Sequence, residues 1–174
     1  MKKKLKYKIG KNPLIREPTI IYPDNVIGDN FQTGHFVVIR QNNRIGNNVS
    51  IGIHSDVAHD VVIEDNVRIH SKCFIPEYSI IKKNAWIGPC VVLTNDKYPN
   101  SIDGKSNLKG PIIEEYAKIG ANSTILPGVK IGKYALIGAG TVVVNDVPDY
   151  AIIVGNPGKV KGDIRNLKKY VIVE

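Results

Sequence analysis

The sequence predicts an all-β fold, a parallel β-helix built from repeated six-residue units. A frame that starts at Ile15 and advances by six residues meets an aliphatic side chain at 13 of 14 positions through Leu93. The frame resumes at Ile113 and meets an aliphatic residue at six of six positions through Val143, although Ile, Val and Leu make up only 52 of the 174 residues. A period of six fits neither an α-helix nor one long amphipathic strand. It fits a short strand with alternating inward side chains, then a tight corner, repeated along the chain.

The other positions of the six-residue unit support this prediction. The residue after the aliphatic one is often glycine or alanine, and the fourth residue after it is compact or branched, as a second inward position requires. Asparagine recurs where the chain must turn, because asparagine and glycine accept the backbone conformations of tight corners. The corner asparagines are Asn30, Asn42, Asn48, Asn66, Asn84 and Asn122.

The repeat is interrupted once, between Leu93 and Ile113. Continuing the first frame would bury Pro99, Lys105 and Pro111, so residues 95–111 must leave the helix as an excursion loop. We therefore expect a β-helix domain over 12–160, preceded by a basic leader (1–11) and followed by a tail (161–174). An insertion can be a tolerated surface loop. We favour a functional loop, because a regular solenoid has few other ways to form a concave site.

The net charge of +8 suggests nucleic acid at first sight, but its distribution argues against that class of ligand. Residues 1–11 hold six lysines and no acid, the tail is also basic, and the region between them is close to neutral. A basic terminus is more often a solvated tail than a specific nucleic-acid site. The chain has no uncharged run long enough for a membrane helix and no apolar stretch behind the lysines, so we expect a soluble, cytoplasmic protein without membrane insertion.

Several short strings carry a resemblance to a known family. IGDNFQ, IGNNVS, IGANST and IGKYAL, with the closing segment 153–160, resemble the hexapeptide-repeat acyltransferases over roughly residues 15–160. The resemblance implies a left-handed β-helix of three hexads, about 18 residues, per turn. It also implies a homotrimer and acetyl-CoA as co-substrate along the late turns. There the small residues Gly120, Ala121, Gly138 and Ala139 would leave a groove for the pantetheine chain, and Lys159 would lie near the CoA phosphates.

The stretch GPCVVLTNDKYPNS at the start of the loop is similar to a narrower group, the enzymes that acetylate the amine of a nucleotide-linked 3-amino sugar. Asn95 matches the asparagine that positions the amine in that group. The resemblance therefore implies an acetyl-CoA-dependent N-acetyltransferase that acts on a nucleotide sugar in glycan precursor synthesis. Asp96, Tyr98 and His35 are the expected substrate contacts.

Turns of 18 residues would stack Gln41, His59, Glu77 and Asn95 in one column. Glu77 would then lie about 5 Å from Asn95, and His59 about twice as far. An unprotonated amine is already nucleophilic, so it needs orientation, which an asparagine oxygen can give by accepting an N–H. Asparagine cannot take up the proton, and this makes Glu77 and His59 the candidate catalytic partners. Corner columns are also polar by default, so a purely solvated role stays open.

Three alternatives remain at this point. An O-acetyltransferase of a sugar or serine hydroxyl would need a general base, and the loop contains no histidine. A γ-type carbonic anhydrase-like zinc hydratase would need three protein ligands, whereas only His54 and His59 show a comparable spacing. We therefore expect no metal. A non-catalytic scaffold is disfavoured by the retained Thr-Asn-Asp sequence at the start of the loop.

Overall fold

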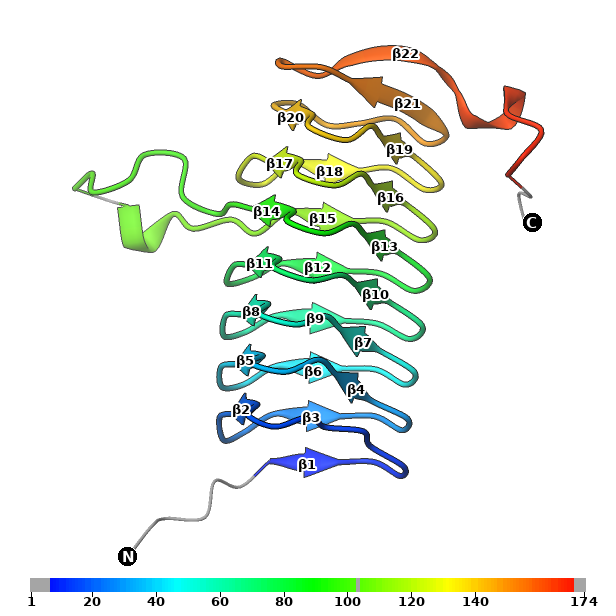
Figure 1. Cartoon of the computed structure of the whole chain (residues 1–174). Helices are drawn as coiled ribbons and strands as arrows, with labels where there is room; N and C mark the ends of the chain where they lie inside the picture. Colours follow the sequence, from blue (N-terminus) through cyan, green and yellow to red (C-terminus); the bar gives the residue numbers. More distant parts are fainter. Residues whose placement is uncertain (1–6, 103, 171–174) are drawn as a thin grey trace, which may run out of the picture.

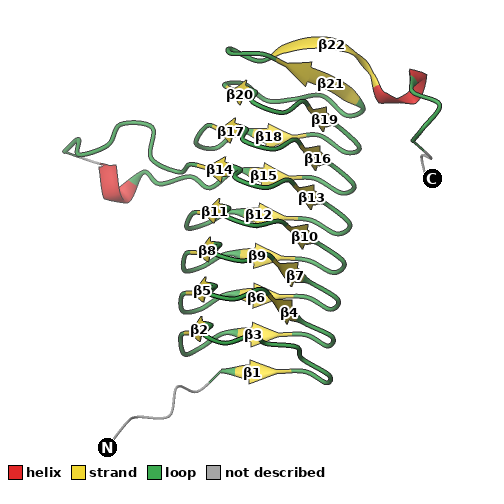
Figure 2. Cartoon of the chain, viewed as in Figure 1, coloured by secondary structure: helices red, strands yellow, loops and turns green. Residues whose placement is uncertain are grey.

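The computed structural model describes residues 7–102 and 104–170, which form a left-handed parallel β-helix with a triangular cross-section (Figures 1 and 2). Three sheets make its sides, and their strands are parallel except for the last strand of sheet B. Sheet A contains β1 (Lys8–Ile9), β3 (Val26–Ile27), β6 (Arg44–Ile45), β9 (Val62–Ile63), β12 (Ile80–Ile81), β15 (Ile112–Ile113) and β18 (Lys130–Ile131). Sheet B contains β4 (Gln32–Thr33), β7 (Ser50–Ile51), β10 (Arg68–Ile69), β13 (Trp86–Ile87), β16 (Lys118–Ile119), β19 (Leu136–Ile137), β21 (Ala151–Val154) and β22 (Lys159–Asp163). Sheet C contains β2 (Ile20–Ile21), β5 (Val38–Ile39), β8 (Asp56–Val57), β11 (Phe74–Ile75), β14 (Val92–Leu93), β17 (Thr124–Ile125) and β20 (Val142–Val143).

The core confirms the hexad interpretation. The second residue of the short parallel strands points inward, and from Ile21 to Val143 these side chains are at most 5% exposed. The compact residues four positions later, such as Val37 and Val91, are also fully buried. Strands pair with residues 18 positions away, as Ile27 does with Ile45. Each turn therefore adds one layer of aliphatic side chains to a continuous core.

The three edges of the prism differ in the residues they carry, and each takes its name from them. The asparagine corner follows sheet A and contains 28–30, 46–48 and 64–66. The glycine corner follows sheet B and contains 34–36, 52–54, 70–72, 120–122 and 138–140. The loop corner follows sheet C and contains 40–42, 58–60, 76–78 and 94–95.

The corners turn through a left-handed backbone conformation at every sixth residue from Asp24 to Cys90 and again from Tyr116 to Gly140. Asn30, Asn48 and Asn66 have φ values of 56°, 56° and 59°. Their side chains also form a ladder, in which Asn30 Nδ2 donates to Asn48 Oδ1 at 2.9 Å and Asn48 Nδ2 to Asn66 Oδ1 at 3.0 Å. Asparagine thus supplies both the required φ and a hydrogen bond to the next turn.

A buried carboxylate, that of Glu114, joins the turns before and after the excursion loop through two partly exposed lysines. The side chain of Glu114 is 7% exposed and lies 3.0 Å from Lys82 Nζ and 3.2 Å from Lys130 Nζ. Burial alone would raise the pKa of Glu114, but the hydrogen bonds from the two lysines outweigh it and hold the pKa below the ordinary value of 4.5.

The excursion loop leaves the stack between β14 and β15 and carries the short 3₁₀ helix η1 (Gly104–Ser106) (Figure 1). Ile81 pairs with Ile113, 32 residues later instead of 18, so the loop adds fourteen residues to one turn. The ends differ from the expected boundaries. β1 already pairs with β3 at Lys8, and β22 runs antiparallel to β21 as far as Asp163 before the short helix η2 (Ile164–Asn166).

Most of the basic leader (1–6) and the last residues of the tail (171–174) lie outside the described residues. The described part contains no helix that is long and apolar enough to span a membrane.

Candidate functional site

The excursion loop is closed at its base by Asn95. The backbone N–H of Lys109 donates to the carbonyl oxygen of Asn95 at 2.8 Å. The carbonyl of Lys109 in turn accepts from the N–H of Gly128 at 2.8 Å, which is the bond that a regular turn would make. Asn95 and Lys109 therefore form a hydrogen-bonded neck at which the chain leaves the helix and returns to it.

The structure brings together the three residues that we placed in one column as catalytic candidates. Asn95 Nδ2 donates to Glu77 Oε2 at 2.9 Å, and Glu77 Oε1 lies 3.5 Å from His59 Nε2. The other ring nitrogen of His59 lies 2.6 Å from an oxygen of Asp60. Since Glu77 engages the amide nitrogen of Asn95, the side-chain oxygen Oδ1 of Asn95 is left to accept a hydrogen bond, and it has no partner among the side chains and backbone groups that the structure describes.

Further side chains that the sequence analysis did not assign to the site surround this column. Arg40 Nη1 lies 3.8 Å from Glu77 Oε1, and Asn42 Nδ2 donates to Asp60. Asp56 lies on β8 beside the same cluster, and its buried Oδ1 has no hydrogen-bond partner in the described part of the chain. Burial raises the pKa of Asp56, Arg40 opposes that effect, and Glu77 adds to it.

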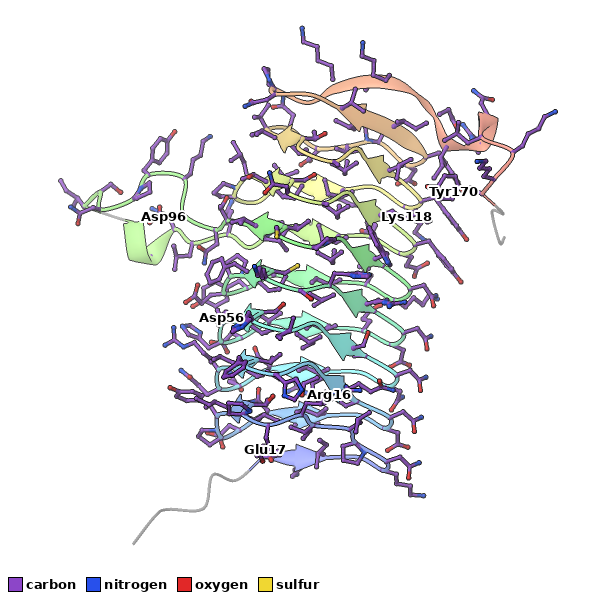
Figure 3. All side chains as sticks on the ribbon, viewed as in Figure 1. Arg16, Glu17, Asp56, Asp96, Lys118 and Tyr170 are labelled. Atoms are coloured by element: carbon purple, nitrogen blue, oxygen red, sulfur yellow. The ribbon has the colours of Figure 1, made fainter. Side chains whose placement is uncertain are left out.

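The two loop residues expected to bind substrate lie just beyond the neck. Asp96 Oδ1 accepts from the backbone N–H of Tyr98 at 2.9 Å, which fixes a tight turn at the start of the loop. The Tyr98 ring is 66% exposed, with Lys97 Nζ 5.6 Å from its centroid. Figure 3 shows Asp96 on the projecting loop, on the opposite side of the molecule from Lys118 and Tyr170. Both candidates therefore belong to the same corner as Asn95.

His35, by contrast, does not join this cluster within one chain. It lies at the glycine corner, where its Nδ1 contacts the carbonyl oxygen of Glu17. His35 and Asn95 are 60 residues apart, which is three turns of 18 residues plus one hexad. Because one hexad carries the chain from one corner to the next, the two residues occupy different corners. The sequence already contained this information.

The small residues expected to hold CoA occupy the upper glycine corner, far from the neck of the loop. Gly140 N–H donates to the Ala121 carbonyl at 2.8 Å, so Ala121 and Ala139 are on successive stacked turns. A Cβ on Gly120 would lie 2.5 Å from Ala139 N, so this glycine is also required by the close approach of neighbouring turns. Gly138 lies one turn above Gly120, and Lys159 is an exposed residue at the start of β22.

The histidines considered for a zinc site lie at different corners. His54 is at the glycine corner, stacked on Phe36 at a centroid distance of 4.8 Å, whereas His59 is at the loop corner. Within the described ranges, no group of three or more His, Cys, Asp or Glu residues could hold a metal ion.

Comparison with known proteins gives the class of the repeat. The family model "Bacterial transferase hexapeptide (six repeats)" matches residues 44–77 and 110–145, on both sides of the excursion loop. The repeat blocks on the two sides of the loop are therefore similar to bacterial-transferase hexapeptide repeats.

Individual relatives narrow the comparison. The bifunctional protein GlmU of Clostridioides difficile (strain 630) is 32% identical over 152 residues, which are 87% of this chain and 31% of GlmU. The dTDP-3-amino-3,6-dideoxy-alpha-D-galactopyranose 3-N-acetyltransferase of Aneurinibacillus thermoaerophilus is 55% identical over 51 residues, 29% of this chain and 27% of that enzyme. The chain thus spans about a third or less of the length of these two curated relatives.

A solved structure shares the fold. It is a point mutant of AntD, an N-acyltransferase from Bacillus cereus, in complex with dTDP-4-amino-4,6-dideoxyglucose and coenzyme A. It superposes with a TM-score of 0.55 at 23% identity and covers 90% of this chain and 82% of AntD.

Proposed function

We propose that the protein is an acetyl-CoA-dependent N-acetyltransferase that acts on the 3-amino group of a nucleotide-linked sugar. The observation that carries the proposal is the set of hydrogen bonds that Asn95 makes. Its Nδ2 is bound to Glu77 at 2.9 Å, its backbone closes the loop neck, and its Oδ1 is left to accept an amine N–H. The names of the Aneurinibacillus relative and of AntD support a nucleotide-linked amino sugar as acceptor.

The reaction needs an oriented amine and a route for one proton. The amine nitrogen attacks the thioester carbonyl carbon, so a C–N bond forms and the C–S bond breaks with release of the CoA thiolate. Asn95 Oδ1 accepts one N–H and so aims the nitrogen lone pair. The proton lost from nitrogen passes to Glu77, which lies next to Asn95 and faces His59 at 3.5 Å, and then to the departing thiolate.

The proposed site is completed by a second copy of the chain. Asn95 occupies the loop corner, whereas Gly120 and Gly138 occupy the glycine corner of the same prism. These corners are separated by one hexad, up to about 20 Å of extended chain. Reacting atoms must approach to about 3–3.5 Å. A homotrimer, in which each copy brings its glycine corner to a neighbour's Asn95, meets this requirement. Because acetyl-CoA and nucleotide sugars are cytoplasmic metabolites, we place the enzyme in the cytoplasm.

Thiol release from acetyl-CoA tests the proposal directly. The assay would compare UDP- and dTDP-linked 3-amino and 4-amino sugars with matched sugars that carry a hydroxyl in place of the amine. We expect release with a 3-amino acceptor and none with the hydroxyl analogue. If only hydroxyl acceptors release thiol, the proposed reaction is wrong.

Substitution of the column tests the residue assignment. Asn95→Ala should lower kcat about 100-fold or more, because the variant lacks the group that orients the attacking amine. Gln41→Ala is the matched control, because Gln41 lies in the same column and its side chain contacts neither Glu77 nor Asn95 in the described structure. Equal activity of the two variants would remove Asn95 from the mechanism.

A further inference from the structure

A polar groove lies on the lower turns of sheet B, beside the glycine corner. Two adjoining hollows of about 260 and 400 Å³ share Gln32, Ser50 and Arg68 in their walls. The first also includes Arg16, labelled on the lower turns in Figure 3, and His70. Their combined size falls within the range of small-ligand sites. No residue assigned so far to catalysis or to CoA lies in this groove.

The groove carries positive charge from two arginines that no described residue of its walls offsets. No acidic residue lines either hollow. Within the described residues, neither Arg16 nor Arg68 has a carboxylate within 4.0 Å, and Arg68 is exposed. Arg16 is held at the edge by Nη1, which donates to the Thr33 carbonyl at 2.9 Å. Burial lowers the pKa of His70, and the nearby Arg68 lowers it further, consistent with uncompensated positive charge.

A comparable hollow on sheet A shows that this lack of acids is specific to the groove. That hollow is lined by Arg44, which is exposed and occupies the outward strand position like Arg68. Its walls, however, contain Glu64, Asp65 and Lys83. The two carboxylates of the sheet A hollow offset the charges of Arg44 and Lys83. Of these hollows, the sheet B groove presents arginine without an acid in its walls.

An aromatic side chain completes the groove at its upper end. Trp86 pairs in register with Arg68 on the next turn, and its ring lies 4.8 Å from the ring of His70. Trp86 also lies in the same turn of the helix as Asn95, since β13, β14 and Asn95 follow one another in the chain. Trp86 is thus at nearly the same height along the helix axis as the loop neck, Arg68 lies one turn below it, and the rest of the groove lies on the turns beneath.

We propose that Arg68 and Arg16 bind the phosphate groups of a nucleotide, with Trp86 as the surface for its base. Arginine suits phosphate because its planar guanidinium donates two parallel hydrogen bonds. Sheet B is the side of the prism opposite the loop corner, so one copy cannot bring this groove to its own Asn95, and the proposal places it against Asn95 of a neighbouring copy. The choice of the acceptor's diphosphate as ligand rests on the proposed function. The phosphates of CoA have the same chemistry and are a second source.

Binding can be measured without any acetyl transfer, because Trp86 is the only tryptophan in the chain. Its fluorescence would be followed during titration with pyrophosphate, dTDP and adenosine 3′,5′-bisphosphate. We expect a saturable change whose affinity falls as salt rises from about 50 to about 200 mM, because salt screens charge pairing. Arg68→Gln should weaken binding by at least about tenfold, the loss of one charge-assisted pair. Arg44→Gln, the matched exposed arginine on sheet A, should leave binding unchanged.

The three ligands distinguish the sources. Tightest binding of dTDP assigns the groove to the acceptor nucleotide, and tightest binding of adenosine 3′,5′-bisphosphate assigns it to the CoA end. The proposal is wrong if no ligand gives a saturable change, or if Arg68→Gln and Arg44→Gln weaken binding equally. If the groove binds no phosphate ligand, thiol release by the wild-type enzyme is still expected. If no amine acceptor releases thiol, phosphate binding to the groove is still expected. The two proposals therefore fail separately.

Discussion

Replacement of Asn48 separates the two roles of a corner asparagine. Asn48 has a φ of 56°, and its side chain makes ladder hydrogen bonds of 2.9 Å to Asn30 and 3.0 Å to Asn66. Asn48→Ala keeps the left-handed φ and the Cβ but loses the polar side chain that lets asparagine tolerate this conformation, at a cost of about 1–2 kcal/mol. It also removes two exposed hydrogen bonds, which together contribute about 1 kcal/mol. We expect a total loss of about 2–3 kcal/mol in the free energy of unfolding.

Asn48→Gly removes the same hydrogen bonds but has no Cβ to strain. Its cost is about 1 kcal/mol for the bonds, plus about 0.5 kcal/mol for the greater freedom of glycine in the unfolded chain. The glycine variant should therefore be more stable than the alanine variant by about 1 kcal/mol. This order is the reverse of the order expected at an ordinary strand or helix position.

Urea unfolding followed by circular dichroism would measure both variants at one protein concentration, because assembly makes apparent stability depend on concentration. Asn145→Ala is the control, since Asn145 is exposed and does not have a left-handed φ, and it should change stability by less than about 0.5 kcal/mol. If the alanine variant equals or exceeds the glycine variant in stability, the backbone conformation is not what selects asparagine at these corners.

Further predictions concern the core, the Glu114 carboxylate and the two thiols. Ile87→Ala should cost about 2–5 kcal/mol in thermal or urea unfolding because Ile87 is 0% exposed, whereas the fully exposed Ile102→Ala should cost almost nothing. The depressed pKa of Glu114 contributes stability above the ordinary carboxyl pKa of 4.5, and that contribution is lost as the pH falls through the lower folded value. The free energy of unfolding of the wild-type protein should therefore be larger at about pH 6 than at about pH 3, and Glu114→Gln should reduce this difference. An unchanged difference would show that Glu114 does not cause the pH dependence. Burial raises the pKa of Cys73 to about 11, so a thiol reagent should label the exposed Cys90 in the native protein and Cys73 only after unfolding.

The hexad frame predicted most of the fold because each structural requirement repeats. An inward position must be aliphatic, a corner must accept a left-handed φ, and both recur every six residues. The same arithmetic predicted the column that joins His59, Glu77 and Asn95. It also contained the first strand, since Ile9 lies one hexad before Ile15, although the lysines around Ile9 led us to begin the domain later.

Contacts that depend on the reach of long or outward side chains were not predicted. Arg40 belongs to the turn that includes Gln41, but only its length brings its guanidinium to Glu77 across two turns. Asp56 stands on an outward strand position that any polar residue could occupy, and its burial comes from the neighbours in sheet C. The six-residue repeat in the sequence predicts neither the contact of Arg40 with Glu77 nor the burial of Asp56.

The hydrogen-bonded neck between Asn95 and Lys109 separates the fourteen-residue excursion from the regular turns of the helix. The register of the turns above and below is set at the neck, so the length and composition of the segment between its two ends are free of the period that constrains the rest of the chain. That segment can therefore change in length and sequence while the core, the corners and the asparagine ladder stay as they are.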